Sequence, residues 1–244
     1  MLHRTSLTLA RLCLVAGISA LACLQSNSEE PSVPKELKYH GHSVASDPGK
    51  VVLSLEQLYR LDPQLAPPST NEKGEKQPSS SRAIPGHNRV KFIEMLKEHM
   101  VAGDSRAAVV VSTKPLLVAA YTDELDCVVM LEFPESLVKD YDLKPGSRLL
   151  TVNTYPTRGD AKDLHRGPKE LKRYKNVFPV IADFFAENRE RVDKRKTAIP
   201  EEEWERCTTL GNDYHERYPK SFRNGAPSQS EIPKEPEAGE LEGS

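Results

Sequence analysis

Apolar residues are concentrated between Arg106 and Tyr155, where four short runs of Val, Leu and Ala contain few charges. These runs span residues 107–111, 116–121, 127–131 and 149–152. The first two are separated by only four residues, which is enough for a hairpin and too short for a crossover helix. The pattern therefore predicts a mainly antiparallel sheet of about four strands at the centre of the core.

The first three runs are apolar at successive positions instead of alternating with polar residues. An antiparallel sheet with one face in water usually shows that alternation, because successive side chains point to opposite faces. Both faces of these strands are therefore expected to be covered, either by helices of the same chain or by a partner.

Helical spacing of apolar residues predicts the elements that would cover the sheet. In residues 88–102, Phe92, Ile93, Leu96 and Met100 share one face. His99 lies next to this face and is expected to be a partly buried, hydrogen-bonded histidine, with a catalytic role as the alternative. Three further helices are predicted over residues 54–61, 177–192 and 200–218. The expected fold class is α+β, with the small sheet packed against three to four helices.

Polar stretches rich in Pro, Ser and Gly divide the chain into segments. The apolar fraction is 37%, below the ~45–50% of an ordinary globular domain, so part of the chain is expected to stay unfolded. The predicted organisation is a signal peptide over 1–22, a disordered tether over 23–50, a single α+β domain over 51–223 and a disordered tail over 224–244. A mobile loop is expected near residues 65–86.

The N-terminus has the features of an export signal. Arg4 and Arg11 precede an apolar run over residues 12–22, no acidic residue occurs there, and Cys23 follows directly. With its small residues before that cysteine, the segment resembles the signal of bacterial lipoproteins, although Ala20 stands where Leu is usual. The resemblance implies a lipidated Cys23 and a location in the cell envelope or periplasm, and the alternative is an apolar helix that is never cleaved.

The cysteines, the histidines and the net charge indicate whether a disulfide, a metal ion or a nucleic acid is expected. Cys127 and Cys207 fall in a predicted strand and a predicted helix, and their spacing leaves open whether they pair. His40 and His42 have no third ligand at metal spacing, so no metal site is predicted. No cofactor motif is present, and a net charge of -2 argues against a nucleic-acid partner.

Two groups of polar residues lie beside the predicted strands. Asp123 and Asp126 occupy the turn after the second strand, and with His165 they are candidates for acid–base catalysis. The alternative for the acidic turn is a solvated hairpin. Asn153, Tyr155 and Arg158 follow the fourth strand, and they are candidate ligand-binding residues because loops after strands commonly hold ligands.

These features predict an exported, lipid-anchored protein that acts as a binding or interaction module. Its expected partners are the membrane, through Cys23, and a protein or a second copy of the chain. The alternative is a periplasmic or surface hydrolase with an acidic site near the sheet edge. A third interpretation is a cytoplasmic interaction protein without a signal. The sequence carries no motif that names a reaction or a ligand.

Overall fold

The computed structural model describes residues 30–40, 45–68, 86–156, 161–168 and 174–230. The chain divides into two units, Met1–Glu30 and Pro31–Ser244, and the fold below is that of the second unit alone. The predicted signal peptide, Cys23 and most of the loop near 65–86 lie outside the described residues.

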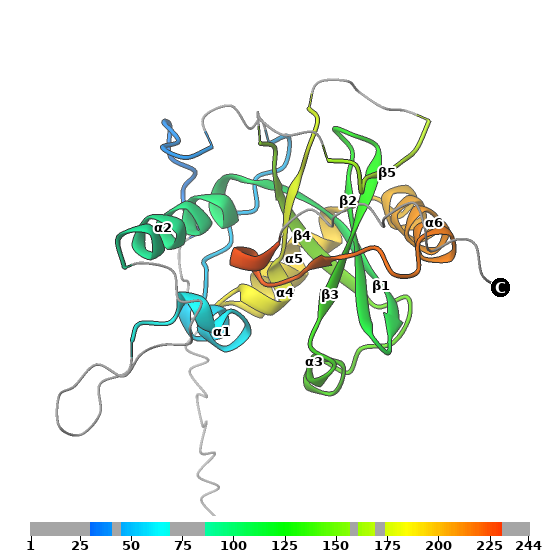
Figure 1. Ribbon diagram of the computed structural model, residues 1–244. Helices are drawn as coiled ribbons and strands as arrows, with labels where there is room; N and C mark the ends of the chain where they lie inside the picture. The colour runs from blue at the N-terminus through cyan, green and yellow to red at the C-terminus, as the bar shows by residue number, and fades with distance from the viewer. Residues whose placement is uncertain (1–29, 41–44, 69–85, 157–160, 169–173, 231–244) are drawn as a thin grey trace, which may run out of the picture. The chain divides into compact units, whose positions relative to one another are not determined.

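Four long strands form the centre of a seven-stranded sheet in the described part of the chain: β1 (Asp104–Thr113), β2 (Leu116–Thr122), β3 (Cys127–Phe133) and β4 (Arg148–Thr154). Three short strands complete it: β5 (His165–Arg166), β6 (Phe178–Ile181) and β7 (Arg223–Asn224). The order is β5-β3-β2-β1-β4-β6, with β7 beside β3 (Figure 1). All neighbours are antiparallel except β3 and β7.

The prediction of an α+β fold with a mainly antiparallel sheet is confirmed, and the number of about four strands is wrong. The additional strands are only two to four residues long and lack a strand pattern of their own. They form because the edges of β3 and β4 offer unpaired backbone groups to segments that pass close by.

Six α-helices accompany the sheet in the described residues, more than the three to four predicted. They are α1 (Leu55–Leu61), α2 (Gly86–Ala102), α3 (Ser136–Asp140), α4 (Ala182–Phe185), α5 (Arg189–Ala198) and α6 (Glu201–Arg217). Two 3₁₀ turns are also present in these residues: η1 (Pro63–Leu65) follows α1, and η2 (Pro227–Gln229) follows β7. The predicted helices over 54–61, 88–102 and 200–218 are confirmed as α1, α2 and α6. Ser54 caps α1, and its side chain accepts from the Gln57 backbone N–H.

Helices of the same chain cover both faces of the sheet (Figure 1). α6 packs across β1, β2 and β3, while α2, α4 and α5 pack against β4. Gly211 allows the close approach of α6, since a Cβ atom there would lie 2.7 Å from the Cβ of Ala119. On α4, the Phe184 ring contacts Phe133 with ring centroids 4.9 Å apart. Every residue of β2 is buried as a result, which confirms that both faces are covered.

The predicted helix over residues 177–192 is wrong. Residues 178–181 form β6, which pairs with β4, and helical structure begins only at Ala182. Pro179 is tolerated because β6 lies at the edge of the sheet, where one side of the strand makes no ladder hydrogen bonds. The apolar spacing read as helical therefore belongs to a strand followed by two short helices.

Parts of the predicted tether and tail are held on the folded body, in contrast to the disorder expected there. Gly49 N–H donates to the Gly103 carbonyl at 2.8 Å, and Asp47 N–H donates to Asp104 at 3.0 Å. At the other end, the backbone N–H and hydroxyl of Ser228 both donate to Asp62 at 2.7 Å. Residues 45–50 and 224–230 are thus fixed by hydrogen bonds to distant segments.

The two cysteines of the described residues are free and buried. Burial raises the pKa of Cys127 to about 12 and raises that of Cys207 further above its ordinary value. Both side chains therefore behave as small apolar groups instead of reactive thiolates.

Candidate functional site

Polar side chains gather at the end of the sheet where β1 begins and where β2 and β4 end. Asp104 and Arg106 are two residues apart on β1, so their side chains share a face. On β4, Asn153 pairs directly with Asp104, which brings it to the same face. Asp123 follows β2 and Tyr155 follows β4. We call these five residues, Asp104, Arg106, Asp123, Asn153 and Tyr155, the Arg106 cluster.

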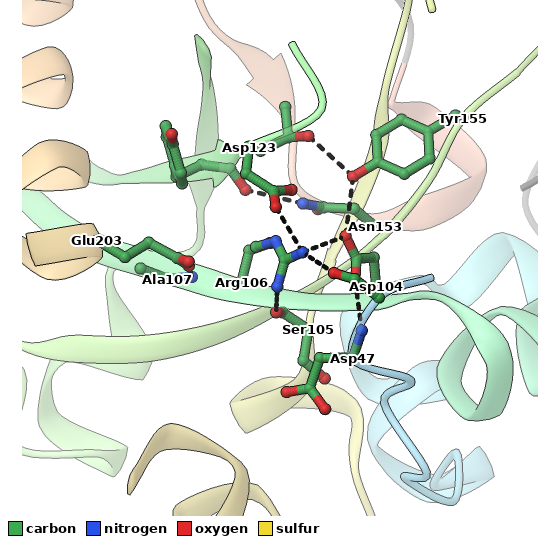
Figure 2. Close-up of polar contacts among 12 residues, drawn as sticks. Asp47, Asp104, Ser105, Arg106, Ala107, Asp123, Asn153, Tyr155 and Glu203 are labelled. Carbon is green, nitrogen blue, oxygen red and sulfur yellow. Dashed lines mark hydrogen bonds and ion pairs between the residues drawn. The ribbon is translucent and has the colours of Figure 1, made fainter. Parts of the chain in front are cut away.

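The Arg106 guanidinium is the centre of this cluster, as Figure 2 shows. Its Nη2 lies 2.9 Å from the Asp104 carboxylate and 2.6 Å from the Asp123 carboxylate, and it also contacts the Ser46 hydroxyl. Nη1 donates to the Ser105 carbonyl at 2.9 Å. One cation thus joins the start of β1 to the turn after β2 and to the segment 45–50.

Tyr155 and Asn153 complete the arrangement from the end of β4. The Tyr155 hydroxyl donates to Asp104 at 3.3 Å and lies 2.9 Å from the Thr122 hydroxyl. Its ring stacks on Tyr174, with centroids 4.5 Å apart. The Asn153 amide donates to the Tyr121 carbonyl at 2.8 Å. These bonds hold the last residues of β4 against β2, across the intervening β1.

Burial controls the electrostatics of the cluster. It raises the pKa of Asp104 to about 6, although Arg106 and the Asp47 N–H favour the charged form. Burial opposes the charge on Arg106 too, but its contacts with Asp123 and Asp104 raise its pKa. The Asp104 side chain is 0% exposed and that of Arg106 is 8% exposed, whereas Asp123 is 43% exposed. Only Asp123 is open to a molecule arriving from solvent.

The other predicted catalytic residues lie elsewhere. Asp126 accepts from the Tyr121 hydroxyl at 3.0 Å and forms an ion pair with Arg206 of α6 at 2.6 Å. His165 of β5 lies with its Nε2 2.5 Å from Asp213 of α6. The structure therefore brings Asp123, Asn153 and Tyr155 together. It places Asp126 in an ion pair with Arg206 and His165 in a separate hydrogen bond with Asp213. Arg158 lies outside the described residues.

Sequence reasoning missed Asp104 and Arg106, which hold the cluster together. The available signal was a pair of charged residues at the start of a strand whose other positions are apolar. Charges in such a position are expected to be paired, because an unpaired buried charge is strongly unfavourable. The residues that pair with Asp104 and Arg106 could not be identified without the register of the sheet.

A second buried polar group involves His99, at the end of α2. Its Nε2 lies 2.7 Å from the Val152 carbonyl, so this nitrogen donates, and Nδ1 accepts from the Thr154 hydroxyl at 3.0 Å. Burial and the neighbouring His40 lower the pKa of His99 to about 3, against the effect of the Val152 hydrogen bond. The predicted hydrogen bonding of His99 is confirmed, but the side chain is fully buried instead of partly buried. The ring is neutral at physiological pH.

The described residues contain no group of three or more His, Cys, Asp or Glu side chains arranged to hold a metal ion. They also contain no helix with the length and apolar character needed to cross a bilayer.

Comparison of the chain with protein-family models, with curated proteins and with solved structures finds no match.

Proposed function

We propose that this protein is exported, anchored to a membrane through a lipidated Cys23, and acts there as a binding module. The N-terminal sequence supports export and anchoring, because its basic start and apolar run end directly before Cys23. Acyl chains on that cysteine would hold the protein at a membrane without a spanning helix, since each buried CH₂ contributes about 0.8 kcal/mol.

The pairing of the two predicted catalytic carboxylates favours binding over catalysis. Asp123 pairs with Arg106, and Asp126 pairs with Arg206. A catalytic acid or base must reach the atom whose proton it moves, within about 2.6–3.2 Å. Carboxylates held in these two separate ion pairs serve better as internal cross-links that fix the ends of strands.

Cell fractionation tests the location. The full chain, produced in a bacterium, is expected in the membrane fraction, and a Cys23→Ser variant is expected to become soluble after export because it lacks the acceptor thiol. A chain that remains in the cytoplasm whether or not Cys23 is present would exclude export and anchoring together.

One observation favours a hydrolase as the second candidate. His165, which lies within hydrogen-bond distance of Asp213, lines a cavity of about 90 Å³ together with Tyr214, Tyr218 and Ser221. The Tyr214 hydroxyl donates to the Ser221 hydroxyl at 3.1 Å. A serine beside a histidine that is oriented by a carboxylate is the arrangement of a nucleophilic hydrolase. The site would then include His165 but neither Asp123 nor Asp126.

A fluorophosphonate probe separates the two candidates. Labelling of Ser221 in the native chain, lost in a His165→Ala variant, would favour the hydrolase. We expect no labelling of Ser221. Its hydroxyl accepts a hydrogen bond from Tyr214, and within the described residues no hydrogen bond joins Ser221 to His165.

A further inference from the structure

A groove of about 440 Å³ lies where α1, the end of α3, Asp183 of α4, residues 186–187 and the start of α5 meet. Its volume falls within the ~300–1,000 Å³ of small-molecule sites. Backbone hydrogen bonds fix its walls: Ser54 N–H donates to the Phe185 carbonyl at 2.7 Å, and Glu187 N–H donates to the Val52 carbonyl at 3.0 Å. An ion pair between Arg60 and Asp140, 3.0 Å long, joins α1 to α3 beside it.

Arg189 and Glu187, a cation and an anion that line this groove, form no ion pair with another described residue. The Arg189 guanidinium lies over the Tyr141 ring, 5.5 Å from its centroid, and forms no ion pair with a described carboxylate. The Glu187 side chain is exposed and forms no ion pair with a described cation. The other charges of the groove are paired, since Arg60 binds Asp140 and Asp183 binds Lys196. Arg189 and Glu187 are thus free to bind a ligand.

The groove also contains a buried acceptor without a donor. The side-chain oxygen of Gln57 is buried and has no hydrogen-bond partner among the described residues. Buried polar groups in native proteins are almost always hydrogen-bonded, so an exception calls for a missing partner. A ligand that donates a hydrogen bond would supply it.

The aromatic surface of the groove is rigidly supported. The Tyr141 ring packs edge to face on Phe184, with centroids 5.1 Å apart, and Phe184 in turn contacts Phe133 of the core. Because this ring is fixed from below, Arg189 above it has a defined position. A guanidinium held in this way can bind a carboxylate through two parallel hydrogen bonds.

We propose that this groove binds a free amino acid. Its carboxylate would pair with Arg189, and its ammonium group would lie between Glu187 and the Gln57 oxygen. The inference rests on the proposed role as a binding module, and it names the class of ligand. A ligand with only one of the two charged groups would leave either Arg189 or Glu187 and Gln57 without a partner.

Isothermal titration of the full chain with each of the twenty common amino acids tests the proposal. At least one is expected to bind, and acetate and methylamine, which carry one charged group each, are expected to bind at least about tenfold more weakly. Arg189→Gln and Glu187→Gln are each expected to weaken binding by about tenfold or more, because each removes a charge-assisted hydrogen bond. Glu190→Gln and Lys194→Gln are matched controls, since these exposed residues lie on the same helix but do not line the groove.

Two results would overturn the proposal: no heat of binding with any amino acid at millimolar concentration, or equal affinity in the Arg189→Gln variant and the native chain. Circular dichroism of each variant shows whether it is folded. The proposed amino-acid site and the proposed location at a membrane can be refuted independently of each other. A cytoplasmic chain that binds an amino acid through Arg189 would exclude export and keep the groove, whereas an anchored chain without such binding would exclude the groove alone.

Discussion

Replacing Arg106 by Met tests whether the Arg106 cluster holds the end of the sheet together. The substitution keeps much of the side-chain volume and removes the cation that contacts both Asp104 and Asp123. Removing one partner of a buried ion pair costs about 3–5 kcal/mol, because the remaining charge is left without compensation. Asp123 is 43% exposed and can regain water, and Asp104 can take up a proton. We therefore expect a loss of about 3 kcal/mol at pH 7, at the lower end of this range.

Urea unfolding of the full chain, followed by circular dichroism, measures this loss. Adding Asp104→Asn to Arg106→Met is expected to recover at least about 1 kcal/mol, since the double variant leaves no ionisable group at the fully buried position. Arg148→Met is the matched control: Arg148 also pairs with a carboxylate, that of Glu201, but both side chains are largely exposed, so little change is expected. A loss below about 1 kcal/mol for Arg106→Met, or simple additivity in the double variant, would refute the reasoning.

Three further predictions concern titration and packing. The Asp104 carboxyl holds its proton more tightly in the folded protein than in the unfolded chain, so this group makes the unfolding free energy fall as the pH rises from 3.8 to about 6. Asp104→Asn should remove this pH dependence of the unfolding free energy in urea titrations, and an unchanged pH dependence would contradict the prediction. His99 makes the unfolding free energy fall as the pH drops below 6.5, because the unfolded chain then takes up a proton while the folded ring stays neutral to about pH 3. The ring signals of His99 in NMR spectra should therefore not titrate between pH 5 and 8. A midpoint near 6.5 would show that the ring is not buried as described. Gly211→Ala adds a Cβ atom 2.7 Å from that of Ala119, so it should destabilise the protein by about 1 kcal/mol despite the better helix propensity of Ala, and a higher melting temperature would disprove the close contact.

Local patterns were sufficient to predict the central strands and three of the helices. Ser54 and Gln57 mark the start of α1 through a contact only three residues long, and the apolar face of α2 repeats at helical spacing. The absence of alternation in the strands correctly indicated that both faces are covered, because each position of β2 is buried. These features depend on residues that are close in the sequence, so they can be predicted without knowledge of the tertiary structure.

Elements that depend on distant partners could not be predicted in the same way. β6 has a sequence that fits a helix as well as a strand, and the open edge of β4 decides between them. The Arg106 cluster shows the same limit, since Arg106 pairs with Asp123, 17 positions away, and Asp104 accepts from Tyr155, 51 positions away. Residue types at strand ends indicated Asp123, Asn153 and Tyr155, but only the register of the sheet places Asn153 opposite Asp104, on the face that Arg106 shares.

The groove beside α5 was beyond sequence reasoning for a related reason. Gln57, Tyr141 and Arg189 come from three separate helical segments, and nothing in their local sequence relates them. Arg189 occupies the first turn of a short polar helix, where a cation is unremarkable until its surroundings are known. Its significance follows only from the absence of a partner within the described residues and from the Tyr141 ring beneath it.

The intact mass of the mature protein, extracted from membranes of cells that produce the full chain, tests the proposed role most directly. We predict a chain that begins at Cys23 and carries the added mass of its acyl groups. A chain that still begins at Met1, with no lipid attached, would contradict the account.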